Sequence, residues 1–151
     1  HVYCWNKPFN NKKLTALPIG LNYCRQYNAM ENYLSEKVEE QNKIAGVFVN
    51  RLRKGMKLQS DPTVIYGINK TVHLGRPLKK SDLLLSHEWN TYRIHGLPPT
   101  PICNVGINAF RAALNPEKSS YLYFVADGKG GHIFSETYEE HKKNIKMIFK
   151  K

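Results

Sequence analysis

Apolar residues recur at helical spacing along two neighbouring segments in the first half of the chain. Residues 29–40 carry apolar side chains three or four positions apart, and residues 42–55 do so in one clear stripe (Ile44, Val47, Phe48 and Leu52). Three cations close the second segment and Gly55 follows them, which is the order typical of a helix C-terminus. The pattern therefore predicts one helix over 29–40 and another over 42–55.

Three shorter helices are predicted from residues that favour a helix start. Asp61 precedes a proline, which suits an N-cap followed by proline at the first helical position. The first two predicted helices are Pro62–Tyr66 and Ser81–Leu85. The third has Asn104 as its N-cap and ends at Asn115 and Pro116.

The last third of the chain has the pattern of a β-hairpin followed by a helix. Residues 121–127 are rich in aromatic and β-branched side chains and predict a buried strand, and residues 132–136 predict its return strand. The glycine-rich sequence DGKGG between them supplies the turn. Thr137 and Glu140 form a capping box that starts a helix with Tyr138 and His141 on its apolar face.

This order of elements predicts an α+β fold, with helices first, then a hairpin, then a C-terminal helix. Residues 1–28 have no regular period, so we expect an irregular N-terminal segment followed by one domain over residues 29–151. A chain of 151 residues is long enough for a single domain with its own core. It has neither a signal peptide nor a run of ~18 apolar residues that could span a membrane.

The charge of the chain narrows the class of partner. The 23 basic residues outnumber the 12 acidic ones and give a formal net charge of +11, which favours a polyanion. Nucleic acid, an anionic lipid surface and the carboxylate-rich polymers of a cell wall all fit that sign. No nucleic-acid motif supports the first of these, so the hypothesis of a basic nucleic-acid binder rests on charge alone.

Three scattered cysteines and isolated histidines predict neither a zinc site nor another metal, and no cofactor motif is present.

Three polar segments carry the candidate chemistry. Gln59, Ser60 and Asp61 crowd hydrogen-bonding side chains before a helix start, although Asp61 could equally act only as an N-cap. Residues 89–106 contain several prolines, which lower the entropy cost of holding Asn90 and Tyr92 in place. Rigid loops with polar and aromatic groups are typical of binding clefts. In the third segment, residues 128–134, glycines leave room for a ligand beside His132.

The sequences IAGVFVNRLRKGMKLQSDPTVIYG, NTYRIHGLPPTPICNVG and ALNPEKSSYLYFVADGKGGHIFSETYEEH resemble, in this order, the endolytic murein transglycosylases of the YceG-like family. The resemblance runs from about Lys43 to the end. It implies a lytic transglycosylase domain that cleaves the MurNAc–GlcNAc β-1,4 bond of peptidoglycan without water and leaves a 1,6-anhydro-MurNAc end. It also implies glycan strands and cell-wall synthesis proteins as partners, no cofactor, and a place at the periplasmic face of the inner membrane.

The family's catalytic glutamate lies on a helix about a dozen residues before the IAGVF stretch, in a segment like A-S-I-V-E-K-E. Counted without a gap, that position falls on Asn32, and a one-residue shift places Glu31 there. Neighbouring residues of a helix point about 100° apart. Only one of the two alignments can therefore direct a glutamate to the position of the family's acid. The hypotheses are therefore an enzyme with Glu31 as its single acid and base, or a glycan-binding remnant without a placed acid.

The resemblance further implies that six residues line the family's cleft (Gln59, Ser60, Asp61, Asn90, Tyr92 and His132). Among these, Gln59 and Asn90 would bond the sugar's N-acetyl or hydroxyl groups, and Tyr92 would stack on a ring. Asp61 would steady the positive charge that develops at C1, unless it only caps its helix.

Overall fold

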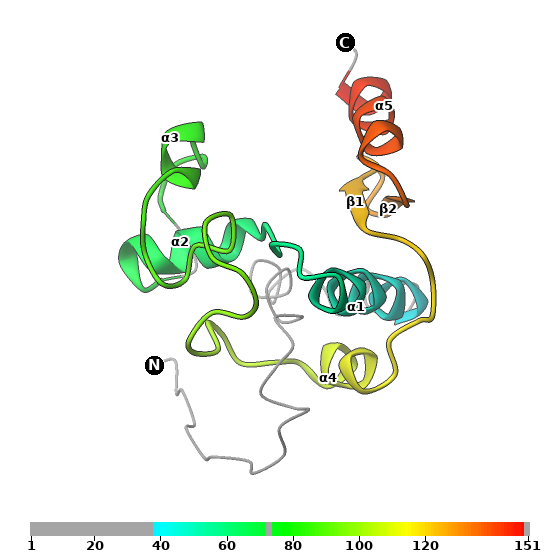
Figure 1. Cartoon of the computed structure of the whole chain (residues 1–151), viewed down its shortest axis with the longest axis horizontal. Coiled ribbons are helices and arrows are strands. Elements are labelled where there is room, and N and C mark those ends of the chain that lie inside the picture. The colour runs from blue at the N-terminus through cyan, green and yellow to red at the C-terminus, as the bar shows by residue number, and fades with distance from the viewer. Residues whose placement is uncertain (1–37, 72–73, 150–151) are drawn as a thin grey trace.

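The computed structural model describes residues 38–71 and 74–149. Its elements in chain order are α1 (Val38–Arg53), α2 (Asp61–Asn69), α3 (Lys80–Leu83), α4 (Ile107–Leu114), β1 (Tyr123–Ala126), β2 (His132–Ser135) and α5 (Tyr138–Phe149) (Figure 1). The predicted α+β class and the order of helices, hairpin and helix are confirmed. Residues 1–28, most of the helix predicted over 29–40, and Glu31 lie outside the described residues.

Helix α1 is the centre of the fold. It is continuous from Val38 to Arg53, so the break expected near residue 41 is wrong: polar residues there have no reason to end a helix without glycine or proline. The apolar stripe is buried as predicted, with Val47 and Phe48 at most 4% exposed. Gly55 ends the helix at φ 64°, and the amide of Met56 reaches back to the Arg51 carbonyl at 2.8 Å.

Helix α4 and the hairpin pack on α1 at separate places. Ala45 and Phe48 of α1 meet Ala109 and Ala112 of α4 in the apolar core. Figure 1 shows α4 below α1, with the hairpin and α5 above it. Phe124 of β1 packs edge-on against Phe48, with ring centroids 5.9 Å apart. This aromatic contact joins the hairpin to the core.

Polar side chains of α1 hold the segment that leads into β1. The amide of Asn50 donates to the carbonyls of Ser119 at 2.7 Å and Tyr121 at 3.1 Å. Arg51 donates from Nε to the Leu122 carbonyl at 2.6 Å. The entry to the strand is therefore fixed to one helix face by three side-chain hydrogen bonds.

The hairpin confirms the predicted strands and turn. β1 and β2 pair antiparallel, with Phe124 opposite Phe134. Gly128 and Gly130 adopt φ values of 75° and 89°, which glycine accepts without strain. The prediction that the first strand is buried is wrong, because a two-stranded sheet covered by α5 on one side leaves its residues half-exposed. The capping box is confirmed by reciprocal bonds between Thr137 and Glu140.

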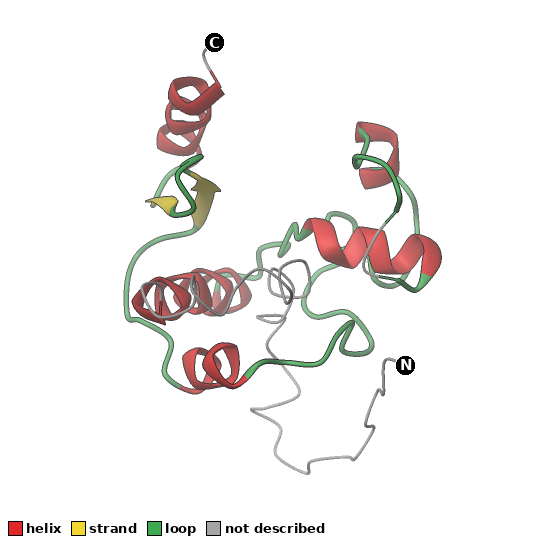
Figure 2. Cartoon of the chain, turned by 180° about the vertical axis from the view of Figure 1, so that it is seen from behind, coloured by secondary structure: helices red, strands yellow, loops and turns green. Residues whose placement is uncertain are grey.

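The short helices differ from prediction at their ends. α2 continues beyond Tyr66 to Asn69, and its N-cap is Ser60, so Asp61 is its first residue and not its cap. α4 is capped by Gly106 and not by Asn104. Long loops join the helices, as Figure 2 shows from behind. None of the helices in the described ranges is long and apolar enough to cross a membrane.

Candidate functional site

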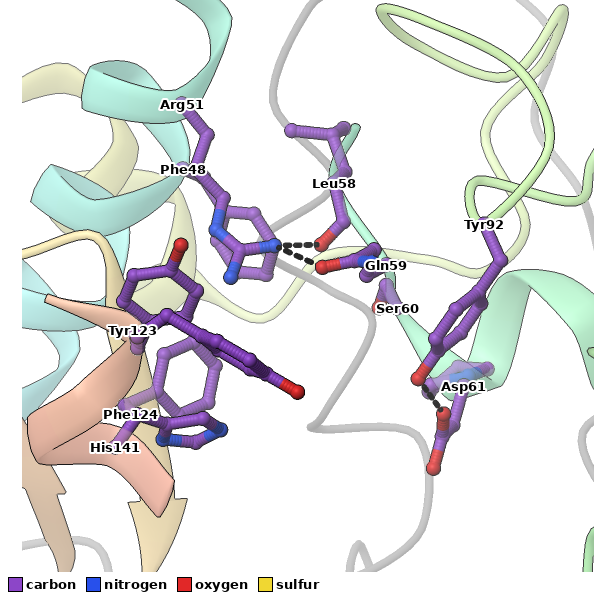
Figure 3. A pocket seen from close by; sticks show the side chains of 12 residues that line it. Phe48, Arg51, Leu58, Gln59, Ser60, Asp61, Tyr92, Tyr123, Phe124 and His141 are labelled. Carbon is purple, nitrogen blue, oxygen red and sulfur yellow. Dashed lines mark hydrogen bonds between the residues drawn. The ribbon is translucent and has the colours of Figure 1, made fainter. Parts of the chain in front are cut away.

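A cavity of about 350 Å³ lies where the C-terminal half of α1, the start of α2 and the hairpin with α5 meet (Figure 3). Its first wall is residues 58–62 together with Tyr92. Its second wall is made of residues from β1 and α5 (Tyr123, Phe124, Tyr138 and His141), and Phe48 and Arg51 of α1 lie between the two walls. Of the residues predicted from the sequence, the structure brings Gln59, Ser60, Asp61 and Tyr92 to this one cavity.

A buried network of hydroxyl groups holds the first wall in place. The Thr63 hydroxyl donates to the Ser60 carbonyl at 2.6 Å, and the Ser60 amide donates to the Thr91 hydroxyl at 2.8 Å. The two threonine oxygens lie 2.9 Å apart. Because the Thr63 hydroxyl has one proton and donates it to the Ser60 carbonyl, the Thr91 hydroxyl is the donor in the bond between the two threonines. Both threonines are fully buried, so this network joins the two loops that carry the candidate residues.

Gln59 is held in an unusual backbone conformation. Its φ is 52°, in the left-handed region that residues other than glycine seldom adopt. Its amide donates to the Thr91 carbonyl at 3.1 Å, and its side-chain oxygen accepts from Arg51 at 3.2 Å. These two bonds compensate a conformation that costs free energy, which is a pattern common at functional sites.

Asp61 and Tyr92 form a pair on the first wall. The Tyr92 hydroxyl donates to Asp61 Oδ1 at 2.5 Å. Burial and then the neighbouring Asp61 raise the pKa of Tyr92, so its phenol stays protonated and remains the donor. The side chain of Asp61 is therefore engaged with Tyr92 and does not cap α2.

Asn90 does not reach the cavity. It is fully buried, and its amide donates to the carbonyls of Leu83 at 3.1 Å and Leu85 at 2.6 Å. Its oxygen accepts from the Tyr92 amide at 2.9 Å. All of these bonds are internal, which leaves nothing for a sugar. Asn90 instead shapes the loop that presents Tyr92.

His132 is also absent from the cavity lining. One carboxylate, that of Glu40, accepts from the His132 amide at 2.8 Å and lies 3.1 Å from its Nδ1. The ring packs edge-on against Phe124, with centroids 5.4 Å apart. In the structure His132 therefore ties β2 to the beginning of α1, rather than facing a ligand from the turn.

The second wall was missed by the sequence reasoning. The sequence pattern explains Arg51 as one of the cations that favour the end of a helix, yet it is only 7% exposed. Its spacing of four and three residues from Val47 and Phe48 places it on the buried face of α1, and that spacing is visible in the sequence. His141 was placed on the apolar face of its helix, which is the face that meets the cavity.

His141 and Tyr123 lie against each other on this second wall. Their rings stack with centroids 5.3 Å apart. Burial lowers the pKa of His141, and the positive charge of Arg51 lowers it further, so the imidazole is neutral at pH 7. Its Nδ1 is buried and has no hydrogen-bond partner within the described residues. A neutral imidazole can donate or accept one hydrogen bond toward a ligand.

The donor set of the cavity suits a polar organic ligand. Among residues 38–71 and 74–149 no three histidine, cysteine or acidic side chains come together as metal ligands would. The cavity instead combines aromatic faces with amide, hydroxyl, carboxylate and guanidinium groups. Aromatic walls with a few fixed polar groups are typical of ligand-binding clefts. The arrangement defines an α+β domain with a polar, aromatic binding cleft.

Comparisons with known proteins place this domain in a family. The model of the YceG-like family matches residues 35–147, and the chain belongs to that family. It is 46% identical over 114 residues to a protein of Bacillus subtilis named endolytic murein transglycosylase, covering 76% of this chain and 31% of that protein. A protein of the same name from Streptococcus pneumoniae is 34% identical over 115 residues, covering 72% of this chain and 20% of its own length.

A solved structure agrees with this assignment. The crystal structure of a YceG-like protein from Listeria monocytogenes matches with a TM-score of 0.64 and 48% sequence identity. The match covers 69% of this chain and 33% of the Listeria chain. The chain thus spans about a third or less of the proteins it matches.

Proposed function

We propose that this chain is the catalytic part of a lytic endotransglycosylase that cleaves the MurNAc–GlcNAc β-1,4 bond of peptidoglycan and leaves a 1,6-anhydro-MurNAc end. The family match over residues 35–147 carries the proposal, because the relatives in it are named endolytic murein transglycosylases. The polar, aromatic cavity inside the matched region supports it. We further propose that the domain works in the cell envelope, where peptidoglycan lies.

The reaction needs one group that serves first as an acid and then as a base. A hydrolase uses two carboxyl groups because one must handle water or the sugar. In the proposed reaction a protonated glutamic acid gives its proton to the glycosidic oxygen, and the C1–O bond breaks with its electron pair moving to that oxygen. The C6 hydroxyl oxygen of the same MurNAc then bonds to C1, and its proton passes to the carboxylate. No water enters, and the acid is regenerated.

We assign the acid to Glu31, because a one-residue shift of the alignment places it at the position of the family's catalytic glutamate. Asp61 is suited to a different task, because its carboxyl group lines the cavity and is held there by a hydrogen bond from the Tyr92 phenol. A fixed negative charge in the cavity stabilises the positive charge that develops at C1. Gln59 and Ser60 lie beside Asp61 on the same wall, which supports contacts from this segment to sugar hydroxyl or N-acetyl groups.

The test is digestion of purified sacculi by the 151-residue chain. We expect soluble muropeptides whose mass is lower by one water than the products of hydrolysis, seen by liquid chromatography with mass spectrometry. Glu31→Gln should abolish their release, and the control variant Glu36→Gln, five residues further along the chain, should release them at the wild-type rate. Loss of release in Glu36→Gln alone would move the acid to that residue. Products with reducing ends would overturn the transglycosylase mechanism.

The alternative is a glycan-binding remnant of the same family. The gapless alignment that places Asn32 at the position of the acid favours it. It predicts that the wild-type chain sediments with sacculi and that no anhydro product forms.

A further inference from the structure

The guanidinium group of Arg51 is surrounded by neutral acceptors. Nε donates to the Leu122 carbonyl at 2.6 Å, and Nη1 lies 3.1 Å from the carbonyls of Lys57 and Leu58 and 3.2 Å from the Gln59 side-chain oxygen. These bonds engage Nε and Nη1, which lie on different edges of the planar group. Figure 3 shows the guanidinium between the Gln59 wall and the Tyr123 wall of the cavity.

No carboxylate in residues 38–71 and 74–149 forms an ion pair with this buried cation. The acid of the cavity, Asp61, accepts its hydrogen bond from Tyr92. Burial lowers the pKa of Arg51, because desolvation disfavours its charged form, although arginine still keeps its proton at neutral pH. A buried charge without a counter-ion costs free energy, so proteins seldom keep one unless something else supplies the opposite charge.

The other terminal nitrogen of Arg51 is available to a ligand. Nη2 makes no hydrogen bond to any residue in the described part of the chain, and Arg51 itself lines the cavity. The guanidinium carbon lies 4.9 Å from the centre of the Tyr123 ring, a cation–π contact with the second wall. The N–H groups of Nη2 can donate charge-assisted hydrogen bonds to a carboxylate oxygen, and such bonds are stronger than those between neutral groups.

We propose that Arg51 is the recognition group for a carboxylate of the glycan substrate. This inference rests on the proposed function. Peptidoglycan offers two sources of that chemistry: the lactyl carboxylate of muramic acid, free where the peptide has been removed, and the carboxylates of the stem peptide. His141 lies on the same wall of the cavity, stacked on the Tyr123 ring that the guanidinium contacts.

The first arm of the test changes the ligand and leaves the protein intact. Binding of the wild-type chain is measured by calorimetry with soluble glycan strands freed of peptide, and with the same strands after conversion of their lactyl carboxylates to methylamides. A third ligand is peptide-bearing strands, with and without the same conversion. We expect conversion to weaken binding about tenfold, equivalent to about 1.4 kcal/mol. The strand type that shows the effect identifies the lactyl or the peptide carboxylate as the source.

The second arm changes the protein. Arg51→Met should bind charged and converted strands equally, whereas Lys143→Met, which removes an exposed cation of α5, should keep the tenfold preference. If the preference persists in Arg51→Met, the overall positive charge causes it and the proposal is wrong. Arg51→Lys keeps the charge without the planar fork, and we expect it to retain only part of the preference. If Arg51→Met fails to fold, Arg51→Lys and the ligand arm decide.

The failures of the two proposals are distinguishable. Equal binding of charged and converted strands by the wild-type chain, with anhydro products still released from sacculi, overturns the role of Arg51 and leaves the proposed function standing. Absence of both glycan binding and product overturns the proposed function, and the carboxylate site falls with it.

Discussion

Replacing Thr91 with valine should destabilise the fold and loosen the first wall of the cavity. The side chain keeps its shape but loses the hydroxyl that accepts from the Ser60 amide and donates to Thr63. Valine cannot replace either bond. The site is fully buried, so no solvent water is at hand to take the place of the hydroxyl.

The magnitude follows from the groups left without partners. The Ser60 amide becomes a buried donor with no acceptor, which costs roughly 1–3 kcal/mol. Thr63 still donates to the Ser60 carbonyl, so its loss is smaller. We expect a fall of about 2 kcal/mol in the free energy of unfolding, and at about 2–4 °C per kcal/mol this lowers the melting temperature by roughly 4–8 °C.

Urea unfolding followed by far-UV circular dichroism measures the change. Ser86→Ala, which removes an exposed hydroxyl, is the control and should stay within about 0.5 kcal/mol of the wild type. Thr63→Val should also destabilise, because it leaves the Thr91 hydroxyl without an acceptor. The double variant lacks the Thr91 hydroxyl altogether. Its loss of unfolding free energy should therefore be about 1 kcal/mol less than the sum of the losses in the two single variants.

Two outcomes would refute this reasoning. Additive costs for the two threonine substitutions would show that the hydroxyl groups do not interact. A Thr91→Val protein as stable as the wild type would show that the Ser60 amide finds another acceptor, and that the wall is held by something other than this network.

Two other expectations concern α1 and α3. Gly46→Ala should cost about 1–3 kcal/mol in urea unfolding, because its Cβ would lie 2.4 Å from the backbone oxygen of Glu117; Gly106→Ser, in open space at an N-cap, is the near-neutral control. The bonds of Asp82 to Arg76 and to the Lys79 amide lower its pKa from 3.8 to about 2. Its carboxylate should therefore stabilise the fold above about pH 4, and this stabilisation should be lost as the pH falls through 2. A stability difference between the wild type and Asp82→Asn that stays constant from pH 6 to 2 would contradict this.

The elements of the fold were predictable where local signals agreed with one another. Gly55 follows a cationic last turn, and the glycines after Asp127 are the residues that positive φ values favour, so a helix end and a turn could be placed from sequence. Helix starts were less certain. Asp61 and Ser60 are both good N-caps, and the choice between them was made by the long-range bond from Tyr92 to Asp61, which no local rule contains.

The candidate site was predictable only on its first wall. Gln59, Ser60 and Asp61 are neighbours in sequence and remain neighbours in the cavity. Asn90 has the composition of a ligand-binding residue, but whether its amide turns outward or inward depends on the carbonyls of Leu83 and Leu85, which the chain brings to it through a turn. A sequence shows that a polar side chain is present, and tertiary contacts decide whether its hydrogen bonds are already used.

Arg51 is a residue whose place in the candidate site could not be predicted from the sequence. A cation in the last turn of a helix is favoured by the helix dipole whether or not it is buried, so that explanation alone makes a functional role unnecessary. What separates the two cases is the helical face: Arg53 and Lys54 are exposed, whereas Arg51 shares the buried face with Val47 and Phe48. Burying a guanidinium there is costly unless acceptors meet it, and those acceptors come from residues 57–59 and 122, which are distant from one another in sequence. Periodicity can therefore indicate which charge is buried, but only the assembled walls show that its acceptors are all neutral and that one terminal nitrogen remains for an anion.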